Sequence, residues 1–213
     1  MAARLCLPVI VAAASIAAAG AASAHPHVWV TVKSEVVYAP DGSVTGVRHA
    51  WTFDDMFSAF ATQGLESKQK GAFTREELAP LAEVNVTSLK EFKFFTFAKA
   101  DGKRTIFTDP VDYYLDYKDG MLTLHFTLPL KAPVKPKSLQ IDIYDPTIFV
   151  EFTFDKKDPV ALKGAPDACK LAIARAGDAV PQGRQLGEDF FNSLTASSNF
   201  GAQFANKISV TCP

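Results

Sequence analysis

The sequence has few histidines and cysteines, and it lacks the short motifs that identify most enzyme classes. Its 213 residues include four histidines and three cysteines, without a Cys-x-x-Cys pair for redox chemistry or a zinc knuckle. It contains neither a Ser-His-Asp or Cys-His signature nor the glycine patterns of P-loop and Rossmann proteins. Lys and Arg number 22 against 23 Asp and Glu, and since no basic run is present we expect no nucleic-acid partner. We therefore expect a protein that is not an enzyme.

The one long apolar run lies at the N-terminus, and it predicts a signal for export. Arg4 precedes an apolar, alanine-rich stretch over residues 5–22, and Ala22-Ser23-Ala24 forms an A-x-A cleavage site. A membrane anchor is the alternative, because the stretch is long enough to be one. The stretch is only weakly apolar, because it is mostly alanine, and it ends in small residues. Both features favour a cleaved signal over an anchor. We expect a cut after Ala24 and a periplasmic domain of residues 25–213, with no stable membrane insertion after the cut.

Removal of this signal takes Cys6 away and leaves two cysteines, Cys169 and Cys212. An even pair in an exported chain predicts a disulfide bond that closes the C-terminal segment. In the chain-entropy model a loop of this length contributes about 3–4 kcal/mol to the free energy of unfolding.

Alternation of apolar and polar residues predicts a mainly β domain with about ten short strands. Three Asp-Gly pairs and Asp145-Pro146 predict turns between them, and residues 156–168 are expected to form a loop. Regular hairpins at this spacing favour a β-sandwich or a partly open barrel of antiparallel hairpins. The predicted strands cover residues 28–38, 44–53, 92–99, 104–108, 111–117, 121–128, 139–145, 148–154, 170–175 and 207–211.

A change to helical spacing predicts a helix–loop–helix inserted at about residues 55–90. The first helix covers residues 54–65. The second covers about 75–90, and Thr74 and Glu77 form a capping box at its start. One further helix is expected near residues 188–194.

The inserted helix pair has the outline of an EF-hand. With Gly71 at position 6 of the loop, Glu77 falls at position 12. Positions 3, 5 and 9 should carry oxygen ligands, but they fall on Lys68, Lys70 and Thr74. Two ammonium groups repel a cation, so we expect a degenerate EF-hand that binds no calcium. An ordinary capped helix pair that matches by accident is the alternative.

Cleavage after Ala24 would leave a chain that begins His25-Pro26-His27, with an α-amine and two imidazoles within three residues. Such nitrogen donors suit Zn²⁺, Ni²⁺, Co²⁺ or Cu²⁺, whereas calcium and magnesium prefer oxygen. His49 is the natural third ligand, because its strand is expected to pair with the strand that follows His27. The alternatives are a solvated leader without a ligand and, for His49, a hydrogen-bonded core histidine beside Trp51.

Three other side chains are weaker candidates for metal ligands: His125, Asp142 and Asp145. His125 alternates with leucines on its predicted strand, which predicts a position on the opposite, outer face. The two carboxylates would supply an oxygen ligand or orient an imidazole. Asp145 precedes Pro146, which is equally typical of a turn.

Six segments carry a resemblance to a known family: HPHVWV (25–30), RHAWTFDDMFSAFATQGL (48–65), REELAPLAEVNVTSLKEFKFF (75–95), LTLHFTLPL (122–130), IYDPTIFVEF (143–152) and GAQFANKISVTCP (201–213). Together they resemble one family of small periplasmic proteins of unassigned function. This family is usually catalogued as the periplasmic component of an uncharacterised ABC-type transport system, and its members are often encoded near nickel/cobalt-type permeases. The resemblance implies an inner-membrane transporter or permease as partner, and it carries His25, His27 and His49 over as candidate metal ligands. Relatives often have alternating Asp residues before REELAPLA, whereas this chain has ESKQKGAFTREE there, in agreement with the charge argument.

The leading hypothesis is a periplasmic accessory or binding protein of a transport system. It would receive or deliver a divalent transition metal through His25, His27 and His49. The alternative is a metal-free, transporter-associated module that docks a partner protein. A third, less favoured hypothesis is a copper oxidoreductase with an N-terminal histidine brace, for which the sequence offers no substrate surface or redox partner.

Overall fold

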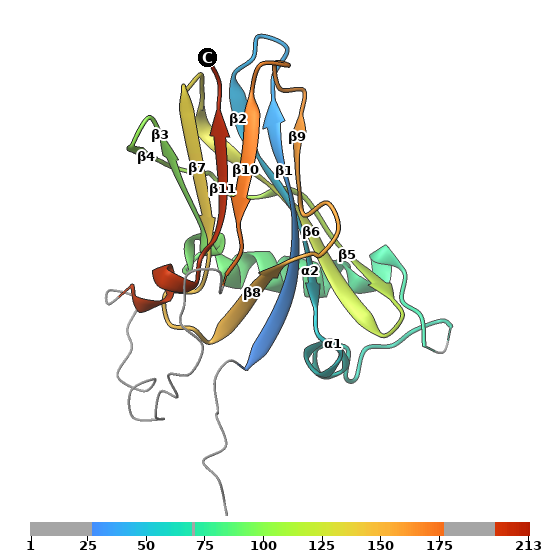
Figure 1. The fold of residues 1–213 in the computed structure, drawn as a ribbon. Coiled ribbons are helices and arrows are strands. Elements are labelled where there is room, and N and C mark those ends of the chain that lie inside the picture. The colour runs from blue at the N-terminus through green and yellow to red at the C-terminus, as the bar shows by residue number, and fades with distance from the viewer. Residues whose placement is uncertain (1–26, 70, 177–198) are drawn as a thin grey trace, which may run out of the picture.

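Two β-sheets share one hydrophobic core in this structure, a computed structural model that describes residues 27–69, 71–176 and 199–213 (Figure 1). The mainly β fold predicted from the sequence is confirmed, and no closed barrel forms within the described ranges. The six-stranded sheet has the order β5 (Val111–Lys118), β6 (Met121–Val134), β2 (Val44–Phe53), β1 (Val28–Tyr38) and β8 (Val150–Phe154), with β9 (Val160–Lys163) also paired to β1. The five-stranded sheet has the order β10 (Lys170–Ala174), β11 (Asn206–Thr211), β7 (Ser138–Ile143), β3 (Thr96–Ala100) and β4 (Lys103–Thr105).

The two N-terminal strands form the hairpin that the alternation predicts. β1 and β2 have the predicted bounds and pair antiparallel, with Val30 opposite Phe53 and Ser34 opposite His49. Successive side chains of a strand point to opposite faces, so His49 and Trp51 share the inner face, where each is 1% exposed. The aromatic inner face of β2 is therefore part of the core.

Both predicted helices of the insertion are present. α1 (Asp55–Ala61) is shorter than expected, whereas α2 (Arg75–Leu89) has almost the predicted bounds. The capping box is confirmed, since the Thr74 side chain accepts from the Glu77 N–H and the Glu77 side chain accepts from the Thr74 N–H. α2 packs against β5, and its buried side chains are Leu78, Ala82 and Val86.

One carboxylate holds the loop between the two helices. Oε1 of Glu77 accepts a hydrogen bond from the backbone N–H of Lys68 at 3.0 Å, and Oε2 accepts one from Thr74 at 2.8 Å. Gly71 adopts φ +77°, the left-handed conformation that favours glycine. The glutamate at the last position of the loop is thus engaged by backbone donors, and the likeness to an EF-hand stays a prediction.

The strand pair that was expected to turn at Asp145-Pro146 is not a hairpin, and this prediction was wrong. β7 lies between β11 and β3 in the five-stranded sheet, whereas β8 lies parallel to β1 in the six-stranded sheet. The chain therefore passes from one sheet to the other at Asp145. The period-2 pattern identifies both strands, but it contains no information about the sheet that each strand joins.

The segment 156–168, expected to be a loop, contains the short strand β9. β8 and β9 both run parallel to β1, with β8 beside its first half and β9 beside its second half (Figure 1). Four residues are too few for alternation to stand out, which explains why the sequence pattern missed this strand.

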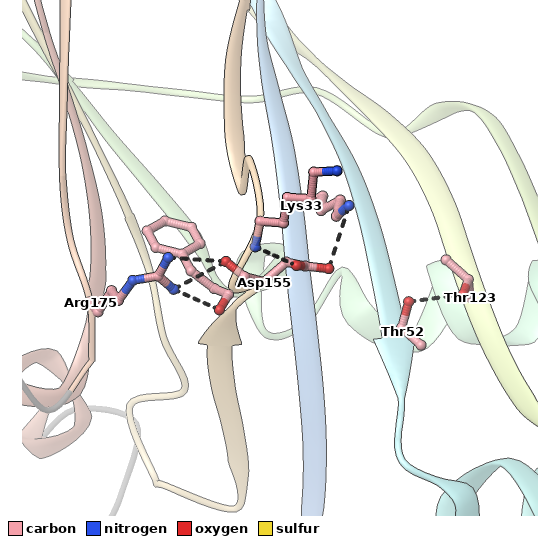
Figure 2. Close-up of polar contacts among 7 residues, drawn as sticks. Lys33, Thr52, Thr123, Asp155 and Arg175 are labelled. Atoms are coloured by element: carbon pink, nitrogen blue, oxygen red, sulfur yellow. Dashed lines mark hydrogen bonds and ion pairs between the residues drawn. The ribbon is translucent and has the colours of Figure 1, made fainter.

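Side chains of the five-stranded sheet bind backbone carbonyls at the edge of the six-stranded sheet. The guanidinium of Arg175, directly after β10, donates to the carbonyl of Phe154 at 2.8 Å and to that of Asp155 at 3.1 Å (Figure 2). The buried amide of Asn206 donates to the carbonyl of Phe152 at 2.6 Å. These bonds satisfy edge carbonyls of β8 and join the two sheets on this side.

The predicted disulfide between Cys169 and Cys212 is confirmed, and it links the start of β10 to the end of β11. No helix in the part of the chain described is long and apolar enough to cross a membrane. The predicted signal at residues 1–24, His25 and the helix expected near 188–194 lie outside the described residues.

Candidate functional site

His49 lies in the core, and both nitrogens of its ring have partners. Nδ1 is 2.9 Å from Oγ of Ser34, and Nε2 is 3.3 Å from Oγ1 of Thr96. Ser34 belongs to the neighbouring strand β1, whereas Thr96 begins β3 in the other sheet. The ring also packs against Trp51 and Phe126, at centroid distances of 5.5 and 5.1 Å. His49 therefore connects the two sheets through the core.

The Thr96 hydroxyl determines the tautomer of His49. It donates its one proton to the carbonyl of Phe94 at 2.7 Å, so it accepts from Nε2–H of the imidazole. Nδ1 is then unprotonated and accepts from the Ser34 hydroxyl. Burial lowers the pKa of His49 to about 3, which keeps the ring neutral. With both nitrogens engaged, this imidazole has no lone pair left for a metal ion.

The strand register holds His49 away from His27. The ring of His27 packs against Phe149 with 4.7 Å between centroids, and its backbone N–H donates to the carbonyl of Phe149 at 2.9 Å. His49 lies opposite Ser34, which at a rise of about 3.3 Å per residue is about 23 Å along β1 from His27. The structure therefore does not bring the predicted third ligand, His49, to His27.

His125 lies on the outer face of the six-stranded sheet, as the alternation predicts, and so faces away from His49. Its Nε2 is 3.3 Å from Oδ2 of Asp116, and its ring stacks on Tyr114 at 4.5 Å. Arg75 donates from Nε to Oδ1 of the same carboxylate at 2.8 Å, and its guanidinium lies 3.8 Å from the Tyr114 ring centre. Burial lowers the pKa of His125, although the nearby Asp116 opposes this. The cluster links α2 to β5 and β6.

The two candidate carboxylates also have structural partners. Both oxygens of Asp142 accept from Nε2 of Gln140 at 2.9 Å. Asp145 is 5% exposed, and it accepts from the N–H and hydroxyl of Thr147 and from the N–H of Val150. These bonds fit the turn role of Asp145. Across the described ranges, no group of three or more His, Cys, Asp or Glu side chains is placed to hold a metal ion.

An apolar pocket of about 590 Å³ lies where the inner face of the six-stranded sheet meets α2. Its volume falls within the range of about 300–1,000 Å³ that is usual for small-molecule sites. The walls come from β1, β2, β8, both helices, the 3₁₀ turn η1 (Lys93–Phe95) and the β7–β8 loop. The lining residues are Val28, Val30, Trp51, Phe53, Phe57, Asn85, Ser88, Leu89, Phe92, Phe95, Asp145, Thr147, Phe149, Val150 and Phe152.

The β7–β8 loop is a fixed wall of this pocket. The hydrogen bonds of Asp145 shape the loop from within, and Gly201 in η2 (Phe200–Phe204) holds it from outside. The N–H of Gly201 donates to the carbonyl of Pro146 at 3.0 Å. A Cβ atom on Gly201 would lie 1.8 Å from the carbonyl oxygen of Asp145, so only glycine permits this approach. The C-terminal segment therefore positions the loop.

Exposed apolar side chains lie in the pocket wall and on α1. Phe92 and Phe149 both line it, yet they are 47% and 48% exposed. Met56 and Phe60 are more exposed still, and they lie on α1, the helix that contributes Phe57 to the wall. Large apolar side chains that gather at the surface are typical of binding surfaces.

Reasoning from the sequence did not identify this pocket. The available signal was the seventeen phenylalanines, a high number for a chain of this length, of which six line the pocket. Trp51 adds a polar atom to this region, since its buried Nε1–H has no hydrogen-bond partner among the described residues. The sequence could not show that these aromatics leave space between them.

Comparison with known proteins connects the chain to sequences without an assigned role. A family model described as "Protein of unknown function (DUF1007)" matches residues 10–212. An uncharacterised 15.5 kDa protein from Spirochaeta aurantia is 32% identical over 105 residues, which is 49% of this chain and 74% of that protein. An uncharacterised protein from Haemophilus influenzae is 22% identical over 196 residues, covering 89% of this chain and 91% of the relative.

Proposed function

The chain belongs to DUF1007, a family of proteins of unknown function, and we propose that it is a binding protein whose ligand occupies the apolar pocket. The pocket itself is the observation that carries the proposal. A concave apolar site with a few polar groups is the usual form of a ligand site. Burial of apolar surface contributes about 25 cal/mol per Å², so an apolar ligand gains affinity from this wall without a strong polar contact.

The chemistry of the wall favours binding over catalysis. Asp145 is the one ionisable side chain among the described lining residues, and its two oxygens accept hydrogen bonds from its own loop. General acid–base catalysis requires a group that exchanges a proton with the substrate. Asp145 is instead committed to the geometry of the turn.

We further propose that the protein is exported and works beside an inner-membrane transporter. The signal pattern of residues 1–24 and the family resemblance support this proposal. A metal role is a separate proposal that rests on His25 and His27, because His49 is engaged within the core.

Displacement of an apolar fluorescent probe tests the pocket. N-phenyl-1-naphthylamine should gain fluorescence with the purified domain of residues 25–213 and lose it when decanol is added. Ser88→Phe places a large ring in the wall from α2 and should weaken probe binding about tenfold or more. Thr87→Phe is the matched control, since Thr87 is an exposed neighbour on the same helix that does not line the pocket. Equal probe binding by both variants would refute the proposal.

A further inference from the structure

The one ionisable side chain among the described residues of the pocket wall is a carboxylate, and this bears on the ligand. Asp145 lies in the wall, and no lysine, arginine or histidine is among the described lining residues. In a site of low polarity, an anionic ligand group would face the Asp145 carboxylate with little screening from water.

The nearest lysines on the chain are directed elsewhere. Lys90 forms an ion pair with Asp109 at 2.8 Å. Lys90 and Lys93 line a different cavity, together with Thr96 and Thr108. The C-terminal end of α2 therefore supplies no cation to the wall of the apolar pocket.

An exposed ring at the pocket favours a cationic head group. Phe92 lines the pocket, stacks on Phe95 with 5.2 Å between centroids, and is 47% exposed. The faces of aromatic rings carry partial negative charge, and they attract ammonium groups. The aromatic wall and the Asp145 carboxylate thus act in the same direction on a charged head group.

We propose that the pocket selects apolar chains whose head group is uncharged or cationic, and that it rejects chains with a carboxylate or phosphate head. This inference rests on the proposed function, because it assigns a ligand class to the same pocket. The occupant is an amphiphile of this class. A hydrophobic segment of a partner protein is the competing occupant.

A series with one chain length and three head groups tests the selection. Decanol, decyltrimethylammonium and decanoate are compared as displacers of N-phenyl-1-naphthylamine at pH 8, where the carboxylate is ionised. We expect the alcohol and the ammonium to bind at least about tenfold more tightly than decanoate. Asp145→Asn, which keeps a side-chain oxygen for the turn, should narrow this gap in affinity at least about threefold. Asp142→Asn, on the five-stranded sheet and bound to Gln140, should leave the gap unchanged.

The outcomes separate this inference from the proposed function. If decanoate binds as tightly as decanol, the charge selection is refuted while the pocket remains a binding site. If none of the three amphiphiles displaces the probe, both proposals fail and a protein segment becomes the favoured occupant. If the difference in affinity is unchanged in Asp145→Asn, the charge that selects is not in the pocket wall, and the inference is wrong.

Discussion

Ser34 and His49 face each other across the β1–β2 hairpin, and the serine hydroxyl lies 2.9 Å from Nδ1 of the imidazole. Thr96 of the other sheet engages Nε2 of the same ring. This arrangement gives the most conspicuous histidine of the sequence a structural role. Trp51, on the same strand, lies in the wall of the apolar pocket.

The burial of neutral His49 predicts a pH dependence of stability. Burial lowers its pKa in the folded state to about 3, below the value of about 6.5 expected when unfolded. Between these values the unfolded chain binds the extra proton, so the free energy of unfolding falls as the pH falls. The slope is about 1.4 kcal/mol per pH unit, or about 2 kcal/mol between pH 6.5 and 5.

Urea unfolding at several pH values measures this slope. His49→Gln should be less stable at pH 8 by about 1–3 kcal/mol, because the Ser34 hydroxyl loses its acceptor. The variant should also lose the slope assigned to His49. His125→Gln, which removes an imidazole from the outer face, should retain most of it. A wild-type slope in His49→Gln would show that the buried ring does not control acid sensitivity.

The N-terminal histidines are predicted to bind a transition metal independently of the core. A domain that begins at His25 should bind Cu²⁺ or Ni²⁺ in isothermal titration, and His25→Ala with His27→Ala should reduce the affinity at least about tenfold. His125→Ala should have no effect, since His125 is paired with Asp116 on another face. Unchanged affinity in the double variant would exclude this site. Mass spectrometry of the exported protein checks whether the chain begins at His25.

The loop between the helices is predicted to bind no calcium. Lys68 and Lys70 lie where an EF-hand has carboxylates, and the Glu77 oxygens accept backbone N–H bonds. Calorimetric titration with Ca²⁺ should show no binding heat, and micromolar binding would contradict the account.

The backbone hydrogen bonds to the Glu77 carboxylate lower its pKa. Their contribution to the free energy of unfolding is therefore present near neutral pH and is lost as the pH falls through that lowered value. Glu77→Gln should therefore destabilise the domain modestly at neutral pH. Glu83→Gln, which removes a carboxylate of the same helix outside the loop, is the comparison variant.

The disulfide between Cys169 and Cys212 should matter for stability. It spans a sequence separation of 43 and ties β10 to the C-terminal strand. Replacing both cysteines with serine should cost about 2–5 kcal/mol, which denaturant unfolding of both proteins would reveal. Since both cysteines lie away from the apolar pocket lining, probe binding by the folded double variant should be unchanged. A loss of probe binding at full folding would show that the disulfide itself shapes the pocket.

Local patterns in the sequence predicted the bounds of strands and helices better than they predicted which strands pair. The bounds of β1 and β2 follow from strict alternation, and α2 follows from the Thr74–Glu77 capping box. The destination of β8 could not be predicted, because both sheets accept an alternating strand and the choice depends on β1, which lies far away in the sequence. The sequence patterns therefore predicted a sandwich or barrel of hairpins that includes one hairpin, β7–β8, which does not form.

The candidate site shows the same limit. The alternation placed His49 correctly on the face of Trp51, but it could not reveal that Thr96 reaches Nε2 from the other sheet. Nor could it reveal the pocket, because a pocket is the space that many distant side chains leave open. Phe92 and Phe149 meet there only after α2 and the β7–β8 loop have been placed.

The most direct test of the central claim uses Trp51 as a reporter within the pocket wall. The chain has two tryptophans, so Trp29→Phe leaves Trp51 as the sole indole. A bromine-labelled decanol quenches indole fluorescence on contact. We predict saturable quenching of Trp51 that is weakened by Ser88→Phe and unaffected by Thr87→Phe. Quenching that is absent, or that rises without saturation and equally in both variants, would contradict the assignment of this pocket as the ligand site.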